Sequence, residues 1–324
     1  KKLMFKKILV PLDGSQHSRS ILGWATGLAG VLEAEIILLS VIDTEEIEIL
    51  EATTRDLHRS KAGATTSTIR TPSDVIGDAL SQAEKDLQEV ADRITAAGVI
   101  ASIRVGAGSP AEVIVSEAHS REIDLIAMAT RRESALARGV LGSVTDRVLH
   151  STSTPILILY PGEIHKIDDT SDGPARVIVP LDGSILSETA VGPALEIAEA
   201  ANSEVVFTEV IRLPFFGVGV AGIEYGAGDY AGDFGIDSLK EETSKYLQGF
   251  VSTAEAAGLK ASANIRTGSP SQQIVDAAAE IENTIVVMSS HGAGGLKRWV
   301  VGSVADKVIR SARRPVLVIP PIIG

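Results

Sequence analysis

Lys7-Ile-Leu-Val-Pro-Leu-Asp-Gly-Ser15 lies near the start of the chain, and residues 176–184 repeat it as Arg-Val-Ile-Val-Pro-Leu-Asp-Gly-Ser. Three further matches follow in the same order: Gly108-Ser109-Pro110 with Gly268-Ser269-Pro270, Gly142-Ser143-Val144 with Gly302-Ser303-Val304, and Pro155-Ile-Leu-Ile-Leu159 with Pro315-Val-Leu-Val-Ile319. Matches that recur in order along the chain indicate an internal duplication.

Within each copy, short apolar runs alternate with stretches of helical periodicity. In the first copy the predicted strands are 7–11, 35–40, 101–105, 124–129 and 155–159. Helices are predicted around 21–29 and 76–94, after Ser109-Pro110, and from Ser143. Continuous apolar strands are typical of parallel sheets buried on both faces. The predicted fold is therefore α/β, with two tandem, doubly wound, Rossmann-like domains of five parallel strands each.

The predicted domain boundaries follow the repeat. Domain 1 covers residues 1–161, a linker rich in Gly, Asp, Thr and Ser covers 162–174, and domain 2 covers 175–324. Two long segments differ between the copies: residues 45–71 are acidic and rich in Thr and Ser, and residues 213–235 are rich in Gly and aromatics. Each is either a mobile loop, or a lid or partner-docking segment.

The composition excludes several classes of function. The 324 residues are 44% hydrophobic and carry a net charge of −12, which disfavours binding to nucleic acid or an anionic membrane. The absence of cysteine excludes disulfides, thiol catalysis and zinc–thiolate sites. No apolar run approaches the roughly 18–20 residues of a membrane helix, and the start is too short for a secretory signal, so we expect a cytoplasmic protein.

Polar residues follow the predicted strands, where an open parallel sheet binds its ligands. Asp13 and Asp182 each follow the first strand of a copy. Each aspartate precedes Gly-Ser, so it could serve a ligand or simply a turn and helix cap.

A second group of such residues lies later in copy two. Ser289-x-His291-Gly292 precedes Gly302-Ser303 at the start of the last helix. A glycine loop followed by a helix N-terminus suits a polyphosphate. Ser303 with Asp306, like Ser143 with Asp146, also matches a capping box, so the spacing leaves both interpretations open.

The two copies together resemble the universal stress protein family. The features that carry the resemblance are the strand-Pro-x-Asp-Gly-Ser start, Gly-x-Pro before a helix, and the Gly-x-His-Gly-x9-Gly-Ser block before the last strand. The resemblance implies a fold like that of the adenine nucleotide alpha hydrolases and an adenine nucleotide held at the strand ends. In copy two the implied contacts are Pro180, Asp182, Val210, Met288, Ser289, His291, Gly292, Gly302, Ser303 and Val304. Ser289 stands where the family has its first glycine.

Copy one departs further from the family pattern. Its implied contacts are Asp13, Val41, Met128, Arg131, Arg132, Gly142 and Ser143. Ala129-Thr130-Arg131-Arg132 has lost both glycines of the Gly-x-His-Gly block. The two arginines could pair with phosphates, fill an empty site, or be ordinary solvated side chains.

The resemblance implies an ATP-binding regulatory or sensor protein in a stress response, with Mg²⁺ beside the phosphates and no metal site of its own. It also implies a pairing role for the last strands, 156–159 and 316–319, which would give an internal pseudo-dimer and a homodimer. Two alternatives are an interaction module without nucleotide and a slow ATPase or nucleotidyl-type enzyme. The second lacks support, because no Walker motif, nucleophile elbow or partnered base is visible.

Overall fold

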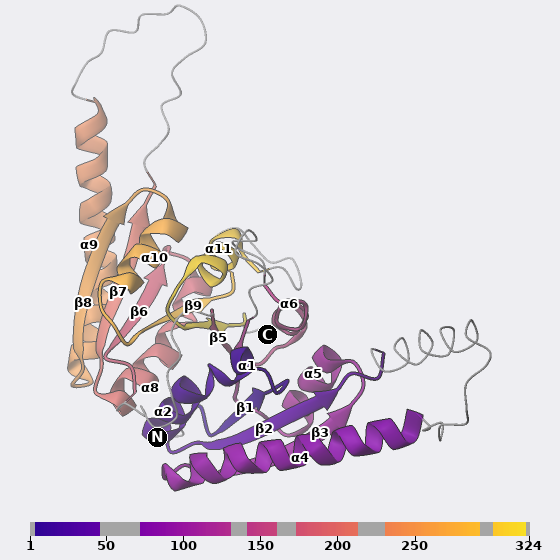
Figure 1. The fold of residues 1–324 in the computed structure, drawn as a ribbon. Coiled ribbons are helices and arrows are strands. Elements are labelled where there is room, and N and C mark those ends of the chain that lie inside the picture. Colours follow the sequence, from indigo (N-terminus) through magenta and orange to yellow (C-terminus); the bar gives the residue numbers. More distant parts are fainter. Residues whose placement is uncertain are drawn as a thin grey trace, which may run out of the picture. The chain divides into compact units, whose positions relative to one another are not determined.

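The computed structural model describes residues 4–45, 72–130, 141–160, 173–212, 231–291 and 301–321, without the side chains of 72, 73 and 231–236. The chain divides into two compact units, Lys1–Gly173 and Pro174–Gly324. Each unit is an α/β domain in which strands and helices alternate (Figure 1). No helix in the described ranges is long and apolar enough to cross a membrane.

The first unit is a parallel sheet in the order β3-β2-β1-β4-β5. Its strands are β1 (Lys7–Pro11), β2 (Glu35–Ile42), β3 (Ala101–Ala107), β4 (Leu125–Ala129) and β5 (Ile156–Leu159). Its helices are α1 (Gln16–Arg19), α2 (Leu22–Leu32), α4 (Pro72–Ala96), α5 (Pro110–Ser120) and α6 (Ser143–Ser151). The strand order changes direction at β1 and β4, and their carboxyl ends are where such sheets bind ligands.

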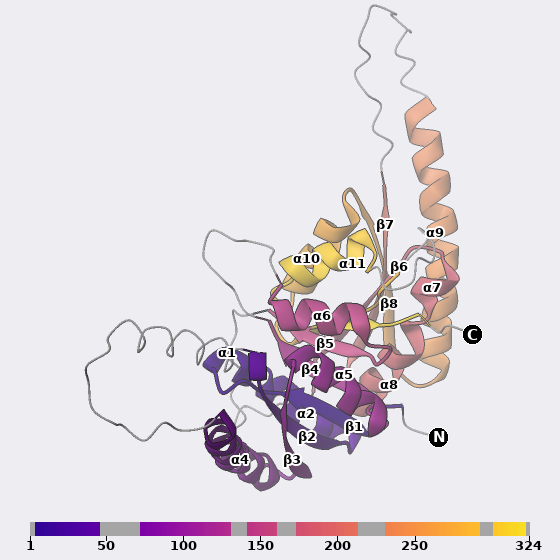
Figure 2. The same ribbon diagram turned by 90° about the vertical axis from the view of Figure 1, so that its right-hand side faces the viewer.

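The second unit repeats this arrangement with the order β8-β7-β6-β9-β10. Figure 2 shows α9 on one side of its strands and α10 and α11 on the other. Its strands are β6 (Arg176–Leu181), β7 (Glu204–Ile211), β8 (Lys260–Thr267), β9 (Thr284–Ser289) and β10 (Val316–Ile319). Its helices are α7 (Ile185–Glu188), α8 (Val191–Ala201), α9 (Ala231–Ala256), α10 (Pro270–Ala279) and α11 (Ser303–Ser311). The doubly wound parallel topology predicted from the repeat is confirmed.

The sheets form the cores, as the apolar runs predict. Ile8, Leu9 and Val10 of β1 are fully buried, because helices cover both faces of a doubly wound sheet. The second unit adds aromatic packing: Phe207 of β7 is also fully buried, and its ring centroid lies 5.6 Å from that of Phe250 on α9.

One predicted boundary is wrong. The segment 213–235 was expected to be a loop throughout, but α9 begins at Ala231. Thr243 is the first buried residue described in α9, which packs on β7 and β8. Gly232 and Gly235 lie in turns that precede this packing, and they do not prevent the helix from starting there. Residues 213–230, like 46–71, lie outside the described residues, so the lid and docking interpretations remain predictions.

Candidate functional site

Asp182 is held by a tight turn directly after β6. Its Oδ1 accepts hydrogen bonds from the Ser184 N–H at 3.2 Å and the Ser184 hydroxyl at 2.6 Å. The Ser184 hydroxyl in turn accepts from the Ser187 N–H at 3.1 Å and so caps α7. Gly183 has φ +76°, a left-handed conformation that favours glycine. The turn therefore fixes an exposed carboxylate at the carboxyl edge of the sheet.

The first unit builds the same turn after β1. Asp13 Oδ1 accepts from the Ser15 N–H at 2.9 Å and from its hydroxyl at 2.5 Å, and Gly14 has φ +79°. In both units the aspartate does the turn chemistry that its sequence suggests. One oxygen of each carboxylate is committed to that role, which also holds the side chain in place.

Val210 lies beside this turn. The register of β6 and β7 pairs Pro180 with Thr208 and Leu181 with Glu209, so Val210 is the next residue on β7 opposite Asp182. Pro180 is buried and Val210 is partly buried. In the first unit Val41 occupies the corresponding place near the end of β2. The structure thus brings together Pro180, Asp182 and Val210, the residues that the family resemblance predicts to lie beside an adenine.

The residues predicted to contact ribose and phosphates lie at the end of β9 and the start of α11. Met288 and Ser289 are the last two residues of β9, and both are buried. The Ser290 N–H donates to the Ile319 carbonyl at 2.8 Å, and the Gly302 N–H donates to the Ser290 carbonyl at 2.7 Å. These two bonds fix the start of α11 beside the end of β9.

The capping-box alternative is wrong for the last helix of both units. The N-caps are Gly302 and Gly142, with no side-chain cap, and the serines occupy the first helical position. Asp306 instead accepts from Arg310 Nε at 2.7 Å. A glycine at the N-cap leaves the serine hydroxyl exposed rather than turned back onto the helix.

The first helical bond of α11 is Asp306 N–H to Gly302 carbonyl, 2.9 Å. The N–H groups of residues 303–305, which include Val304, therefore precede the intrahelical ladder. Together with the Ser303 hydroxyl they form a set of donors at the positive end of a nine-residue helix. Such a set can bind a phosphate or another small anion.

His291 follows directly after Ser289 and Ser290. Its N–H donates to Ser289 Oγ at 3.3 Å, and its Nδ1 lies 3.0 Å from Ser290 Oγ. The Nε2 atom is buried and has no hydrogen-bond partner among the described residues. Gly292, the next predicted contact, lies outside the described residues.

In the first unit a different hydrogen bond holds the start of the last helix beside the end of the fourth strand. Met128 and Ala129 end β4, and Thr130 is fully buried. The Gly142 N–H donates to the Thr130 hydroxyl at 2.9 Å, where the second unit uses a backbone carbonyl. Ser143 begins α6, as predicted. Arg131 and Arg132 lie outside the described residues, so their three interpretations remain open.

Sequence analysis missed a cluster around Glu209. The Tyr246 hydroxyl on α9 donates to Glu188 Oε1 at 3.0 Å. Burial, and then the nearby charge of Asp182, raise the pKa of Glu209. Burial, followed by Glu188 and Glu209, raises the pKa of Tyr246 above its ordinary value. A carboxylate inside the otherwise apolar end of β7 was the signal that could have revealed it.

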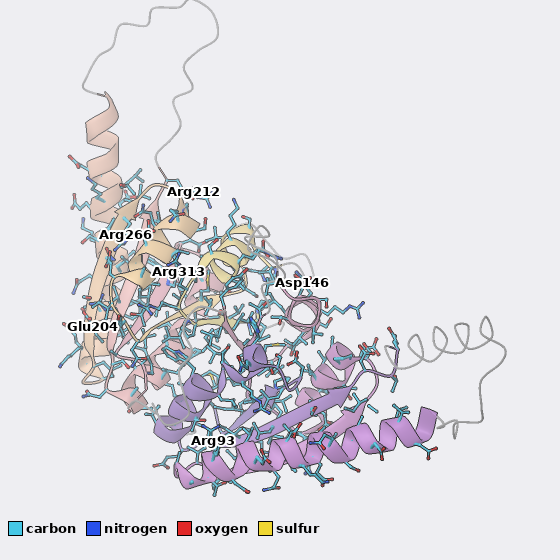
Figure 3. The ribbon with its side chains drawn as sticks, viewed as in Figure 1. Arg93, Asp146, Glu204, Arg212, Arg266 and Arg313 are labelled. Atoms are coloured by element: carbon cyan, nitrogen blue, oxygen red, sulfur yellow. The ribbon has the colours of Figure 1, made fainter. Side chains whose placement is uncertain are left out.

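Several buried polar atoms at this edge have no hydrogen-bond partner in the part of the chain that the structure describes. In the described part of the second unit they include Thr208 Oγ1, Glu209 Oε2, Arg266 Nε and His291 Nε2. The first two lie at the end of β7, the third near the end of β8 and the fourth after β9. Figure 3 shows Arg266 and Arg212 toward the carboxyl ends of these strands and Glu204 at the opposite end.

The first unit differs in this respect. Thr26 Oγ1, one buried atom without a hydrogen-bond partner among its described residues, lies on α2 rather than at a strand end. Nearly all buried polar groups in proteins are hydrogen-bonded, so a group of exceptions at one edge requires an explanation.

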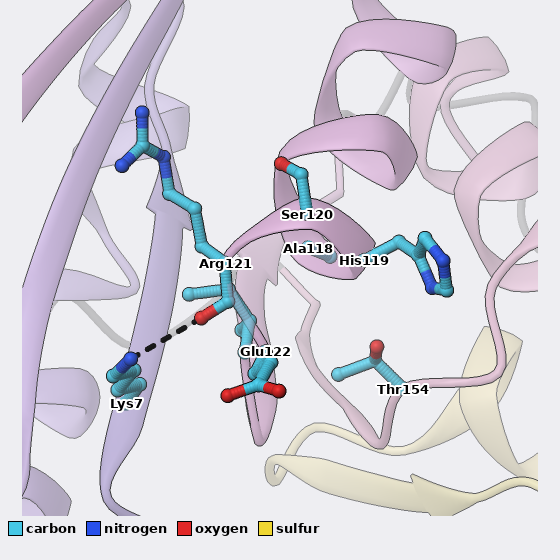
Figure 4. A pocket seen from close by; sticks show the side chains of 8 residues that line it. Lys7, Ala118, His119, Ser120, Arg121, Glu122 and Thr154 are labelled. Carbon is cyan, nitrogen blue, oxygen red and sulfur yellow. Dashed lines mark hydrogen bonds between the residues drawn. The ribbon is translucent and has the colours of Figure 1, made fainter.

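A separate hollow lies at the opposite edge of the first unit (Figure 4). It is lined by Lys7, Ala118, His119, Ser120, Arg121, Glu122, Ile123 and Thr154. Lys7 Nζ donates to the Arg121 carbonyl at 3.3 Å, at the C-terminal end of α5. The hollow is at the amino ends of β1, β4 and β5 and contains no predicted site residue.

The fold and the site together define a class of protein. It consists of two tandem, doubly wound α/β domains, and each has an aspartate turn and a helix with a glycine N-cap at the carboxyl ends of its strands. The family model of the universal stress protein family matches residues 4–159 and 174–320. The chain therefore belongs to the universal stress protein family, as a tandem protein with two such domains.

Individual relatives agree with this assignment. A universal stress protein of Mycolicibacterium smegmatis is 25% identical over 320 residues, which is 97% of each chain. Universal stress protein MJ0531 of Methanocaldococcus jannaschii is 32% identical over 145 residues, 44% of this chain and 81% of that one. A universal stress protein structure from Archaeoglobus fulgidus covers 98% of both chains with a TM-score of 0.66, and its 24% identity makes it a likeness of fold.

Proposed function

We propose that the second unit binds an adenine nucleotide, with ATP as the expected ligand, and that the protein acts as a regulator or sensor in a stress response. The base lies against Asp182 and Val210, above Pro180. Ribose and phosphates lie against the set Met288, Ser289, His291, Gly292, Gly302, Ser303 and Val304.

The observation that carries this proposal is a group of buried polar atoms at the carboxyl edge of the second unit that have no hydrogen-bond partner among the described residues. Thr208 is fully buried beside Pro180, and His291 Nε2 lies on the phosphate side. A ligand rich in donors and acceptors gives such atoms partners, which removes a penalty of about 1–3 kcal/mol for each.

The start of α11 supports the phosphate end of the proposal. Its early N–H groups and the exposed Ser303 hydroxyl are donors, and the helix dipole favours an anion there. The net charge of −12 makes these local donors important, because the chain as a whole repels polyphosphates. Mg²⁺ bound with the phosphates offsets part of that repulsion and is included in the proposal.

The first unit is proposed to bind nucleotide more weakly. It keeps the Asp13 turn, Val41 and the Gly142 cap, but the described part of its edge lacks the unpartnered buried atoms of the second unit. The proposal also includes a cytoplasmic location, pairing of the last strands into a pseudo-dimer, and a homodimer. Sedimentation at several protein concentrations tests the last of these.

Matched variants in the two units test the nucleotide site. Asp182→Ala and Gly302→Val alter the second unit, and Asp13→Ala and Gly142→Val make the same changes in the first. Gly302 has φ −60°, a conformation that valine also adopts, so the substitution adds no backbone strain.

Thermal unfolding with and without ATP–Mg²⁺ provides the measurement. At 100 times Kd a ligand specific for the native state stabilises it by about 2.7 kcal/mol. We expect the second-unit variants to lose this gain and the first-unit variants to keep most of it. A wild-type protein that gains no stability from ATP–Mg²⁺ and carries no nucleotide after purification would refute the proposal.

A further inference from the structure

The cluster around Glu209 is specific to the second unit. Glu209 precedes Val210 on β7, whereas Ser40 precedes Val41 on β2. The register places Glu209 opposite Leu181, the residue before Asp182. One of its oxygens, Oε2, is buried and has no hydrogen-bond partner among the described residues.

The two ionisable groups that the structure shows interacting with Glu209 are Asp182 and Tyr246, an acid and a phenol. Asp182 follows β6, and Tyr246 on α9 bonds to Glu188 on α7. On β8 the residue opposite Glu209 is Ile265, which does not ionise. No cation within the described part of this cluster offsets the charge of an ionised Glu209.

The arginines nearby do not change this balance. Arg266 stands opposite Val210, and side chains alternate along a strand, so Arg266 faces the other side of the sheet from Glu209. Its guanidinium there forms an ion pair with Glu280. Arg212 follows the end of β7 and is exposed.

We propose that Glu209 and Asp182 form a proton-linked pair, so that Glu209 binds a proton more tightly when an adenine nucleotide lies against Asp182. The ligand half of this inference rests on the proposed function. Two carboxylates close together resist ionising at the same time, and a ligand that excludes water strengthens their repulsion. Burial and the charge of Asp182 already raise the pKa of Glu209 in the ligand-free protein.

The first test needs no ligand. Urea unfolding of the full chain is measured from about pH 4 to 8 for wild type, Glu209→Gln and the exposed control Glu242→Gln. The folded-state pKa of Glu209 is raised above its ordinary value of 4.5. Its contribution to stability is therefore fully present below about pH 4.5 and is lost as pH rises through the folded-state pKa.

We expect the wild-type unfolding constant to rise by up to about tenfold per pH unit in that window. Glu209→Gln removes this rise and Glu242→Gln keeps it. Asp182→Asn moves the rise to lower pH, and this second variant decides the question if Glu209→Gln does not fold. Identical pH profiles for wild type, Glu209→Gln and Asp182→Asn would overturn the inference.

The second test uses adenosine, which has no group that titrates between about pH 5 and 8, so the linkage belongs to the protein. Calorimetric titrations in buffers of different ionisation enthalpy count the protons taken up. We expect wild type to bind more tightly at low pH, by about tenfold for each unit by which the ligand raises the pKa of Glu209. Glu209→Gln is expected to bind independently of pH.

The outcomes separate the two proposals. Adenosine binding with the same affinity at every pH overturns the linkage and leaves the proposed function in place. No adenosine binding at any pH overturns the ligand half of the inference, and the ATP–Mg²⁺ measurement then decides the proposed function. The unfolding measurements then still decide whether Glu209 holds its proton in the folded protein.

Discussion

Replacing Gly183 by alanine tests the turn that positions Asp182. Gly183 has φ +76°, and no atom lies within 4 Å of a Cβ added there, so the substitution meets backbone strain without steric overlap. A left-handed residue with a Cβ costs roughly 1–2 kcal/mol. Gly249 is the matched control, because its added Cβ also meets open space, but it lies inside α9 with no positive φ.

Replacing glycine by alanine should therefore destabilise the protein at position 183 and stabilise it at position 249. Gly249→Ala stabilises the helix by roughly 0.5–1 kcal/mol, since alanine loses less backbone entropy on folding than glycine. The two variants should differ by roughly 1.5–3 kcal/mol in the free energy of unfolding of the same unit. Urea unfolding followed by circular dichroism measures the difference. A Gly183→Ala protein as stable as Gly249→Ala would refute the role assigned to the turn.

Three further substitutions test the packing and capping around this edge. Ser184→Ala removes the cap of α7 and should destabilise the second unit by about 1 kcal/mol in urea unfolding, with the exposed Ser244→Ala as a control. Phe207→Ala deletes a fully buried ring and should cost about 3–5 kcal/mol; a loss below about 1 kcal/mol would contradict the packing described for Phe250. Tyr246→Phe should reduce the loss of stability above about pH 10, because a raised folded-state pKa contributes stability that disappears as pH rises through it. If the free energy of unfolding falls equally above about pH 10 in wild type and Tyr246→Phe, the result counts against the hydrogen bond to Glu188.

Much of the fold was predictable because its main determinants are local or repeated. The apolar runs at 7–11 and 176–181 correspond to β1 and β6, since only a strand covered on both faces accepts such continuous hydrophobicity. The Asp-Gly-Ser turns were also predictable, because a left-handed glycine between two hydrogen-bonding residues is a local arrangement.

The features missed depend on tertiary contacts. Glu209 is visible in the sequence as a carboxylate within a strand, but the groups that interact with it, Asp182 and Tyr246, come from distant parts of the chain. The start of α9 was missed because Gly232 and Gly235 disfavour a helix locally. Two glycines in the first turns do not prevent a 26-residue helix whose later turns pack on the sheet. The glycine N-caps were missed because a capping-box spacing does not reveal which residue leaves the helical conformation.

In each unit a hydrogen bond attaches the last helix to the sheet, and the two bonds differ in how well they tolerate substitution. In the second unit the Gly302 N–H bonds to a backbone carbonyl, so almost any residue at position 290 preserves the attachment. In the first unit the Gly142 N–H depends on the Thr130 hydroxyl, which a single codon change can delete. The copy with the better-preserved glycine block thus has the attachment that tolerates sequence drift. The first unit, which has diverged further, relies on the Thr130 side chain. Selection must therefore retain a hydrogen-bond acceptor at that position to hold α6 beside β4.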